Sequence, residues 1–199
     1  QRPRRAHAGA RPVVTGGWAS RGYLPHFDVP GLVQHVTFCL GDALPRDVVD
    51  RWRDALLLKP DGEREAELRR RIERYCDAGH GGCLLREPAV ASIVEGILLR
   101  DDGHGYALLG WVIMPNHVHV LVEAKMPLAK MVQTWKSVSA HRLGRGSIWQ
   151  REYWDRSIRD ERHFRQTLTY IHDNPVKAGL CAMAKDWVFS SAWRERDQA

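Results

Sequence analysis

Residues 106–124 read YALLGWVIMPNHVHVLVEA, and this stretch decides the fold. Apolar and β-branched residues fill 106–114 and again His117–Ala124, which is typical of β-strands. Only Pro115 and Asn116 separate the two runs. Because both residue types favour turns, the stretch predicts a tight antiparallel hairpin.

His117 and His119 lie two positions apart in the second predicted strand. Side chains alternate across a strand, so both imidazoles project from one face, while the neighbouring valines project from the other. Two imidazoles in an apolar strand are costly to bury without partners, and a bound divalent metal is one way to satisfy them. The alternative is a pair of half-exposed histidines on a solvated face of the sheet.

Further elements follow on either side of this hairpin. Residues 32–40 (LVQHVTFCL) predict another strand, and a short strand is expected within 149–159. Apolar residues at helical spacing predict helices from Pro45 onward, over 63–76, from Glu87-Pro88 onward, over 127–143, and from Asp160 to about Asp173, with Pro175 ending the last one. This order indicates an α+β fold, for which a ferredoxin-like antiparallel sheet with helices on one face is the natural closure.

Composition points to a globular protein with an anionic partner. The chain has 199 residues, of which 44% are hydrophobic, which is enough for one domain with a sizeable core. Its formal net charge of +6 favours nucleic acid or an acidic membrane surface. Only six of the 30 basic residues are lysines. Arginine suits bidentate phosphate contacts, although a GC-rich genome explains the same excess.

Cysteine usage and hydropathy indicate a reduced, cytosolic protein. Four scattered cysteines form no CxxC pair, no run of 18 apolar residues predicts a membrane span, and residues 1–12 do not resemble a secretory signal. Cys76, His80 and Cys83 have the spacing of a partial zinc site, but no fourth ligand lies nearby in the sequence.

A second pair of candidate residues lies on the last predicted helix. Tyr170 and Asn174 are four positions apart, so they are neighbours on one helical face beside its apolar stripe. A phenol and an amide there are able to reach a cleft in the sheet. The alternatives are an ordinary amphipathic edge residue for Tyr170 and a C-cap before Pro175 for Asn174.

Six motifs in matching order connect these elements to a known family. They are RGYLPHFD (21–28), QHVTF (34–38), WVIMPNHVHVL (111–121), WQREYWD (149–155), YIHDNPVKAGL (170–180) and WVFSS (187–191). With these motifs the sequence resembles the Y1 transposases of the IS200-like superfamily, which are HUH nucleases, and specifically the REP-associated tyrosine transposases. The resemblance extends over about residues 16–193.

The resemblance implies a role for each candidate residue. His117 and His119 are implied to bind a divalent metal, Mg²⁺ or Mn²⁺, with Asn174 as a third, amide-type ligand. Tyr170 is implied to be the nucleophile. The implied activity is a metal-dependent endonuclease and strand transferase that forms a 5′-phosphotyrosine intermediate on single-stranded DNA at REP-type hairpin repeats.

The resemblance also implies how the chain is organised. A basic N-terminal arm (1–31) precedes a Y1 transposase-like catalytic domain (32–193) with a helical insertion at about 59–105, and a tail (194–199) follows. The implied protein is bacterial, cytoplasmic and nucleoid-associated, with no membrane partner. A monomer is expected, with a dimer as the alternative.

DNA contacts are expected from basic side chains around these elements. The candidates are Arg11, Arg21, Lys136, Arg142, Arg151, Arg156, Arg159 and Arg162. Trp149, Tyr153 and Trp154 either stack on unpaired bases or belong to the core. A hairpin DNA- or RNA-binding regulatory protein that does not cleave is the alternative function, and the presence of both histidines and Tyr170 favours the enzyme.

Overall fold

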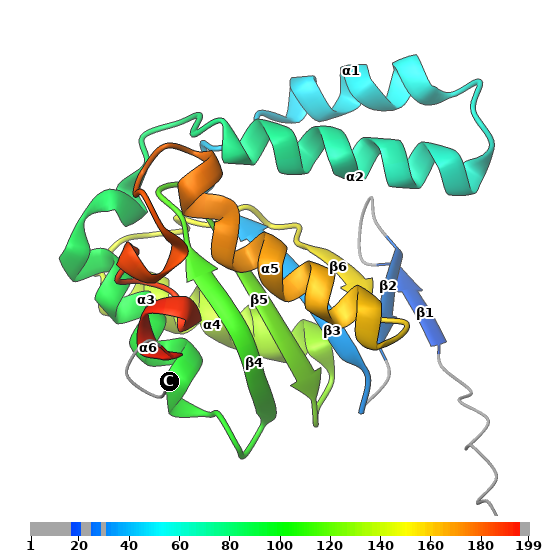
Figure 1. Ribbon diagram of the computed structural model, residues 1–199. Helices are drawn as coiled ribbons and strands as arrows, with labels where there is room; N and C mark the ends of the chain where they lie inside the picture. The colour runs from blue at the N-terminus through cyan, green and yellow to red at the C-terminus, as the bar shows by residue number, and fades with distance from the viewer. Residues whose placement is uncertain (1–16, 21–24, 29–30, 196–199) are drawn as a thin grey trace, which may run out of the picture.

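The centre of the structure is a four-stranded antiparallel sheet (Figure 1). The computed structural model describes residues 17–20, 25–28 and 31–195. The sheet has the strand order β4-β5-β3-β6, formed by β3 (Val33–Cys39), β4 (Tyr106–Ile113), β5 (His117–Ala124) and β6 (Trp154–Ser157). Helix α3 (Pro88–Arg100) connects β3 to β4, and α4 (Leu128–Arg142) connects β5 to β6. This βαββαβ arrangement is ferredoxin-like, so the predicted α+β fold is confirmed.

The predicted hairpin forms the middle of this sheet. The Met114 backbone N–H donates to the His117 carbonyl oxygen (2.9 Å), so Pro115 and Asn116 form the turn between β4 and β5. Strand β5 also pairs with β3, which places Thr37 opposite His119. Because β5 has a neighbour on both edges, its backbone groups are satisfied within the sheet and the strand is buried.

Different helices cover the two faces of the sheet (Figure 1). On one face, the valines of β5 share a core with residues of α3 and α4 such as Val94 and Trp135. On the other face, Val112 and Leu121 pack with Ile171 of α5 (Glu161–Lys177). The expectation of helices on one face was therefore wrong, because β4 and β5 carry apolar residues on both faces and both faces need a cover.

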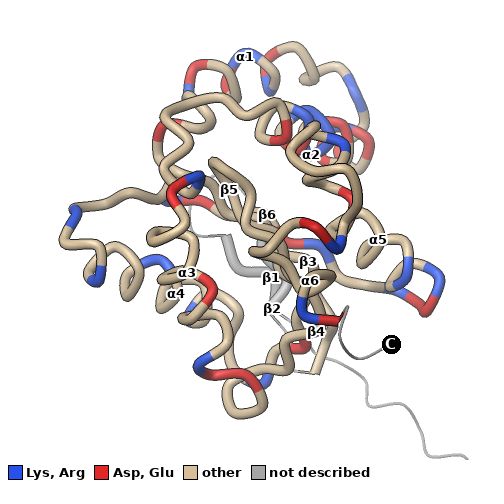
Figure 2. The backbone as a smooth tube through the Cα atoms, turned by 60° about the vertical axis from the view of Figure 1, so that its left-hand side comes forward, with Lys and Arg blue, Asp and Glu red and all other residues tan. Residues whose placement is uncertain are grey.

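Helices α1 (Arg46–Leu56) and α2 (Asp61–Asp77) form a pair that extends beyond the sheet (Figure 1). Basic and acidic residues alternate along both helices (Figure 2) and pair at helical spacing. Buried Leu56, Leu68 and Ile72 attach this pair to the main core. Within residues 59–105, α2 thus belongs to the projecting pair, whereas α3 is a layer of the core.

The segment after α2 is held against the β4–β5 turn. The Asn116 side-chain amide donates to the His80 carbonyl oxygen (2.9 Å), and the Leu85 N–H donates to the Pro115 carbonyl oxygen (3.0 Å). Buried Cys76 and Cys39 have their sulfur atoms 3.1 Å apart. These contacts fix the last turn of α2 beside the start of β5.

Helix α5 continues past the proline that was expected to end it. Pro175 lies inside the helix, which extends to Lys177. Proline removes one backbone donor, but the final turn still forms, because the Ala178 N–H donates to the Asn174 carbonyl oxygen (3.0 Å). Gly179, with φ of +68°, ends the helix in the left-handed conformation that glycine allows.

The start of α5 and the end of the chain complete the fold. The predicted cap is confirmed, since the Asp160 carboxylate accepts from the His163 N–H (2.7 Å). A short 3₁₀ turn, η2 (Ala184–Asp186), and helix α6 (Ser191–Glu195) were not predicted, because elements this short carry little periodicity. Among the described helices, none combines the length and the apolar character that crossing a membrane requires.

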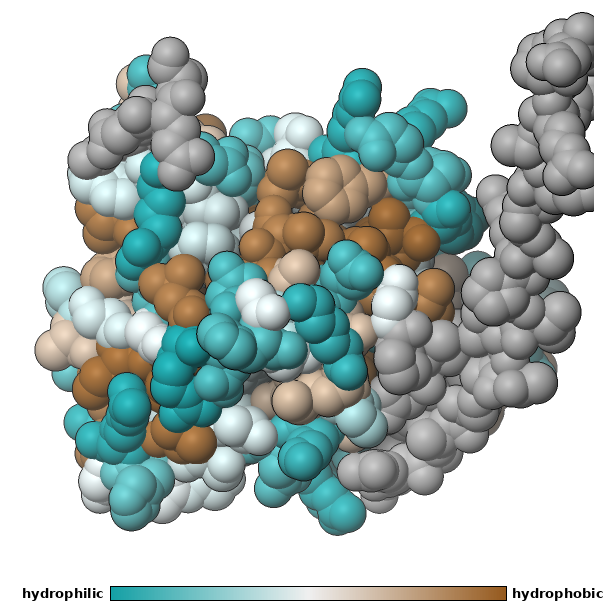
Figure 3. Space-filling view, turned by 90° about the horizontal axis from the view of Figure 1, so that it is seen from below, coloured by the Kyte–Doolittle hydropathy of each residue, from teal (hydrophilic) through white to brown (hydrophobic). Residues whose placement is uncertain are grey.

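A two-stranded ribbon precedes the main sheet. Strands β1 (Gly17–Ser20) and β2 (Pro25–Asp28) pair antiparallel, where an irregular arm was expected. The predicted DNA-binding residues Arg11 and Arg21 lie outside the described residues. Seen from the end opposite α1 and α2, the described surface mixes hydrophilic side chains with small apolar patches (Figure 3).

Gly81 lies in the segment after α2 that is held against the β4–β5 turn, and a substitution there tests the backbone conformation of this segment. Its φ is +88°, and a Cβ atom there would lie 2.8 Å from the Asp42 carbonyl oxygen. Gly81→Ala is therefore expected to lower the free energy of unfolding by about 1–3 kcal/mol. Urea denaturation monitored by circular dichroism measures the change.

Gly62→Ala is the matched control for this substitution. Gly62 lies in the first turn of α2, and a Cβ atom there meets nothing within 4 Å. We expect Gly62→Ala to leave the stability unchanged or to raise it, because alanine favours the helix. An equal free energy of unfolding for the two variants would show that the segment after α2 does not need a glycine at position 81.

Candidate active site

His117 and His119 face each other in the buried interior. Both side chains are 0% exposed, and their Nε2 atoms are 3.0 Å apart. The shared face predicted from the alternation of β5 is confirmed, and the half-exposed alternative is wrong. Two imidazole nitrogens at this distance must share a proton or a cation, because two lone pairs would repel each other.

The turn residue Asn116 determines which nitrogen of His117 carries its proton. The Asn116 amide nitrogen donates to the His80 carbonyl oxygen, so its Oδ1 atom faces His117 Nδ1 at 2.7 Å and accepts a hydrogen bond from the ring N–H. Burial lowers the pKa of His117 to about 4, so the ring is neutral at neutral pH. The Nε2 atom of His117 therefore presents a lone pair to the interior of the site, as a metal-binding imidazole does.

Strand β3 positions the second imidazole. Thr37 Oγ1 is 2.8 Å and His35 Nε2 is 3.2 Å from His119 Nδ1. Both β3 side chains are buried, and burial is the largest cause that lowers the pKa of His35 well below its usual range. The alternation of His35 and Thr37 was visible in the sequence, but their role depends on the β3–β5 register, which the sequence does not specify.

Asp77 is the residue of this site that sequence reasoning missed. It is the last residue of α2, and its Oδ1 atom lies 3.3 Å from His117 Nε2 and 3.7 Å from His119 Nε2. Among the described residues, Asp77, His117 and His119 are the group of histidine, cysteine and acidic side chains close enough to hold a metal ion. The partial zinc spacing forms no such group, since Cys76 contacts Cys39.

Tyr170 and Asn174 reach the same place from α5. The Tyr170 hydroxyl donates to Asp77 Oδ2 (3.2 Å), and its ring meets the His119 ring edge-on with centroids 5.3 Å apart. Asn174 Nδ2 donates to Asp77 Oδ1 and lies 3.2 Å from His119 Nε2. The predicted nucleophile, the paired imidazoles and the predicted amide ligand are thus within contact of one another.

Ionisation of the Tyr170 phenol is strongly disfavoured in this arrangement. Burial is the largest cause that raises its pKa, and the negative charges of Asp77 and Glu73 raise it further. The hydroxyl is therefore protonated at neutral pH. A positive charge placed between Asp77 and the imidazoles would offset the negative charge of Asp77, which after burial is the largest cause of the raised Tyr170 pKa.

Lys136 lies in a structural position rather than on the predicted path of the DNA phosphates. Its ammonium group donates to the backbone carbonyl oxygens of Gln150 (3.0 Å), Arg151 (3.3 Å) and Glu152 (2.9 Å). An ammonium group has three protons, and these bonds use all of them. Burial lowers its pKa to about 8. Lys136 therefore holds the loop that leads into β6.

The remaining predicted DNA-binding arginines occupy different parts of the surface. Arg142 ends α4, which covers the face opposite the histidines. Arg151 is exposed before β6, and Arg159 and Arg162 are exposed near the start of α5. Arg156 lies on β6 directly opposite His35, so it is the member of this set nearest to the site in the sheet register.

A second arginine joins Arg156 at the edge of the site. Arg69 of α2 lies near enough that its charge, after burial, contributes to lowering the pKa of Arg156. Its charge also contributes to lowering the pKa of His35. The Nε atom of Arg69 is buried and has no hydrogen-bond partner among the described residues. A buried guanidinium donor of this kind is suited to an anion such as a phosphate.

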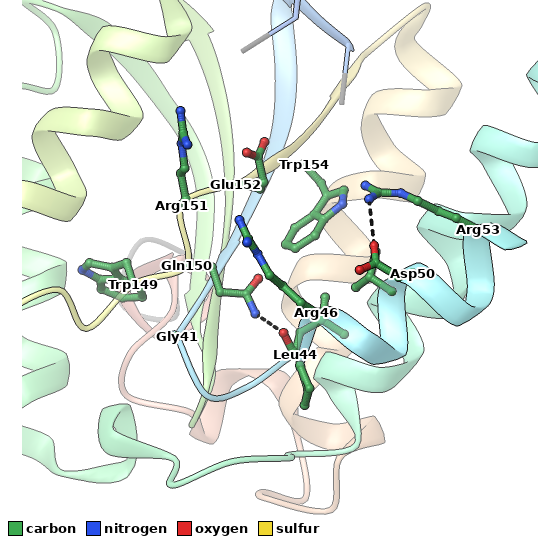
Figure 4. A pocket seen from close by; sticks show the side chains of 12 residues that line it. Gly41, Leu44, Arg46, Asp50, Arg53, Trp149, Gln150, Arg151, Glu152 and Trp154 are labelled. Carbon is green, nitrogen blue, oxygen red and sulfur yellow. Dashed lines mark hydrogen bonds and ion pairs between the residues drawn. The ribbon is translucent and has the colours of Figure 1, made fainter. Parts of the chain in front are cut away.

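A cavity of about 320 Å³ lies between α1 and the loop before β6 (Figure 4). Arg46, Arg151 and the indole of Trp154 are part of its wall. Trp154 lies opposite Thr37 in the β3–β6 ladder, and Thr37 contacts His119. Neither the two imidazoles nor Tyr170 is part of the cavity wall, so the cavity is separate from the site.

Burial decides between the two interpretations of the aromatic motif. Trp149, Tyr153 and Trp154 are 5%, 7% and 8% exposed, which favours a core role over free stacking platforms. Trp149 donates to Ser139 Oγ (2.7 Å) and contacts Phe38 edge-on. In Figure 4 its indole lies apart from the arginines, whereas the Trp154 indole lies among them.

Comparisons with known proteins match the part of the chain that contains the two histidines and Tyr170. The family described as Transposase IS200 like matches residues 88–174. A REP-associated tyrosine transposase of Escherichia coli (strain K12) is 29% identical over 93 residues, which are 45% of this chain and 56% of that protein. A provisionally named REP-associated tyrosine transposase of Haemophilus influenzae is 31% identical over 100 residues, 42% of this chain and 57% of that protein. The matched segments thus span little more than half of these relatives.

A solved structure extends the likeness in fold to most of the chain. A REP-associated tyrosine transposase bound to a REP hairpin superposes with a TM-score of 0.58 at 19% identity, covering 89% of this chain and 86% of that one. The buried histidine pair and Tyr170 both lie inside residues 88–174, so the part of the chain that holds the site is similar to the REP-associated tyrosine transposases of the IS200-like group.

Proposed function

We propose that this protein cleaves and rejoins single-stranded DNA through a covalent tyrosine intermediate. The observation that carries the proposal is the convergence of the Tyr170 hydroxyl with the two imidazoles. The hydroxyl donates to Asp77, and the same carboxylate lies 3.3 Å from His117 Nε2. A nucleophile, a proton acceptor and two metal-type ligands within one buried cluster are suited to phosphoryl transfer.

The proposed reaction exchanges one phosphodiester for another. Tyr170 Oη forms a bond to phosphorus, the P–O3′ bond breaks, and the DNA leaves a free 3′-hydroxyl and a 5′-phosphotyrosine. Asp77 Oδ2 accepts the phenol hydrogen bond and so positions Oη, the phenol proton leaves to solvent, and the departing O3′ takes up a proton from solvent. Because an ester replaces an ester, the 3′-hydroxyl is able to reverse the step.

The donor set of the site fits a divalent cation. His117 presents an Nε2 lone pair, and Asp77 Oδ1 faces both imidazoles, so the acceptors converge where a cation is needed. Bound there by His117, His119 and an oxygen ligand, Mg²⁺ or Mn²⁺ would withdraw charge from a phosphate oxygen. Thr37 and Asn116 fix the orientation of the two rings beforehand.

The surroundings of the site support a single-stranded nucleic acid as the substrate. Arg69 and Arg156 offer guanidinium groups beside His35, while Arg46 and Arg151 line the separate cavity at Trp154. Arginines near a buried nucleophile suit the phosphate backbone of a single strand. As the curated relatives are REP-associated, we propose a REP-type hairpin as the partner.

Substitution of the nucleophile tests the reaction directly. Tyr170→Phe removes the attacking oxygen, so it is expected to form no covalent adduct with a labelled REP-type hairpin in the presence of Mn²⁺. Denaturing gel electrophoresis detects the adduct. Tyr75→Phe on α2, whose ring stacks on His80, is the control and should retain the adduct. Hairpin binding by the wild type without an adduct under any divalent metal would instead indicate a binding protein.

Removal of the cation or of a ligand tests the metal dependence. EDTA and the His119→Ala substitution are each expected to abolish adduct formation while hairpin binding in a filter assay is nearly unchanged. His104→Ala, which changes an exposed histidine in the turn just before β4, should keep full activity. Undiminished cleavage in EDTA after dialysis would contradict a metal-dependent mechanism.

Salt dependence tests the proposed phosphate contacts. Arg69→Ala and Arg156→Ala are each expected to weaken binding of single-stranded DNA several-fold and to reduce the slope of log affinity against log salt by about 0.7 per lost contact. Fluorescence anisotropy at several salt concentrations measures both values. Arg51→Ala, whose guanidinium pairs with Asp47 on the exposed side of α1, should change neither.

A further inference from the structure

We propose that Asp77 supplies the oxygen ligand of the divalent-cation site, and that Asn174 orients Asp77 rather than binding the cation. This inference rests on the proposed cation dependence and names the chemistry of its third ligand. It makes α2 a part of the active site. Asp77 lies outside residues 88–174, so the segment that matches the IS200-like family does not include it.

The distances between the three donor atoms fit one small cation. The two Nε2 atoms are 3.0 Å apart, and Asp77 Oδ1 lies 3.3 Å and 3.7 Å from them. Adjacent ligands of an octahedral ion at about 2.1 Å are separated by about 3 Å. The three atoms therefore lie near the corners of one face of such a coordination sphere. Two imidazoles with one carboxylate are a common donor set for divalent metals.

The hydrogen bonds of Asn174 argue against the amide as the ligand. Its Nδ2 atom faces the site and donates to Asp77 Oδ1 (3.2 Å), whereas its Oδ1 atom is buried without a partner among the described residues. Turning the amide over would place two oxygen acceptors against each other. As long as Asp77 is ionised, Asn174 is held with its nitrogen toward the site.

The charge of the Asp77 carboxylate is a second reason to assign Asp77, rather than Asn174, as the cation ligand. Mg²⁺ and Mn²⁺ are hard cations that prefer charged oxygen ligands, and an amide oxygen is neutral. A carboxylate beside the two buried imidazoles provides the one negative charge that this donor set would otherwise lack. The Asp77 side chain is 32% exposed, so a cation is able to reach it from solvent, while the imidazoles behind it are fully buried.

The fold holds Asp77 in place before any ligand arrives. The preceding residue, Cys76, is fully buried against Cys39 of β3, and the following segment is tied to the hairpin turn through the His80 carbonyl oxygen. Gly79, with φ of +75°, turns the chain directly after the helix. The carboxylate is therefore preorganised, so little conformational entropy is lost when it binds a cation.

Cation binding without DNA tests this assignment. Isothermal titration of Mn²⁺ into the full chain is expected to show affinity at least about tenfold weaker for Asp77→Asn than for the wild type. The substitution keeps the size and one acceptor oxygen, which serves either Tyr170 or Asn174, but removes the charge. Asn174→Ala, which removes the amide, is expected to lose less than about threefold. Electron paramagnetic resonance of free Mn²⁺ gives an independent measure, and circular dichroism checks that each variant is folded.

Glu73→Gln is the matched control, because Glu73 is a carboxylate one turn earlier on the same helix and Asp77 contributes to raising its pKa, after burial. It should bind Mn²⁺ as the wild type does. An equal loss in Glu73→Gln and Asp77→Asn would overturn the proposal in favour of a general charge effect. A greater loss in Asn174→Ala than in Asp77→Asn, or no Mn²⁺ binding by the wild type, would also overturn it.

The experiments distinguish failure of the Asp77 cation site from failure of the Tyr170 mechanism. If Asp77→Asn loses Mn²⁺ while Tyr170→Phe still forms a DNA adduct, the cation site stands and the tyrosine mechanism fails. If Tyr170→Phe abolishes the adduct and Asp77→Asn binds Mn²⁺ normally, the proposed function stands and Asp77 only positions its neighbours.

Discussion

The burial of two imidazoles against each other in the central strand limits how the site is built. His117 and His119 have no access to water, so every ring nitrogen needs a partner inside the protein. The Asn116 side chain and Thr37 contact the outer nitrogens, and the two inner Nε2 atoms lie 3.0 Å apart, so a proton or a cation must lie between them. A cation bound there would displace the proton, so metal binding would be coupled to proton release.

The partners of the two rings come from separate parts of the chain. Thr37 comes from β3, Asn116 from the hairpin turn, Asp77 from α2, and Asn174 with Tyr170 from α5. The sheet register brings Thr37 and Asn116 to the two rings. The packing of α2 and α5 against the sheet brings Asp77, Asn174 and Tyr170. A fold in which α5 covers the second face of the sheet is therefore required to deliver the nucleophile.

Local patterns predicted the parts of this site that depend on short distances along the chain. The hairpin and the shared face of His117 and His119 follow from strand alternation, and the proximity of Tyr170 and Asn174 follows from helical spacing. Asp77 could not be predicted, because its contact with β5 depends on how an amphipathic helix docks 40 residues away in sequence. The assignment of Lys136 failed for a related reason: a basic residue on a helix shows its charge in the sequence, but not the three carbonyl groups that surround it.

The carboxylate at the end of α2 opposes ionisation of Tyr170, the proposed nucleophile. Burial is the largest cause that raises the pKa of this phenol, and the negative charge of Asp77, which accepts its hydrogen bond, raises it further. Removing the carboxylate would ease ionisation but would leave the phenol without its hydrogen-bond acceptor. A cation held between Asp77 and the imidazoles would offset the charge without moving the acceptor, so the same residue would both restrain and position the phenol oxygen. In the proposed mechanism, cleavage would then require cation and phosphate in the site together, which would protect single-stranded DNA from an otherwise always available nucleophile.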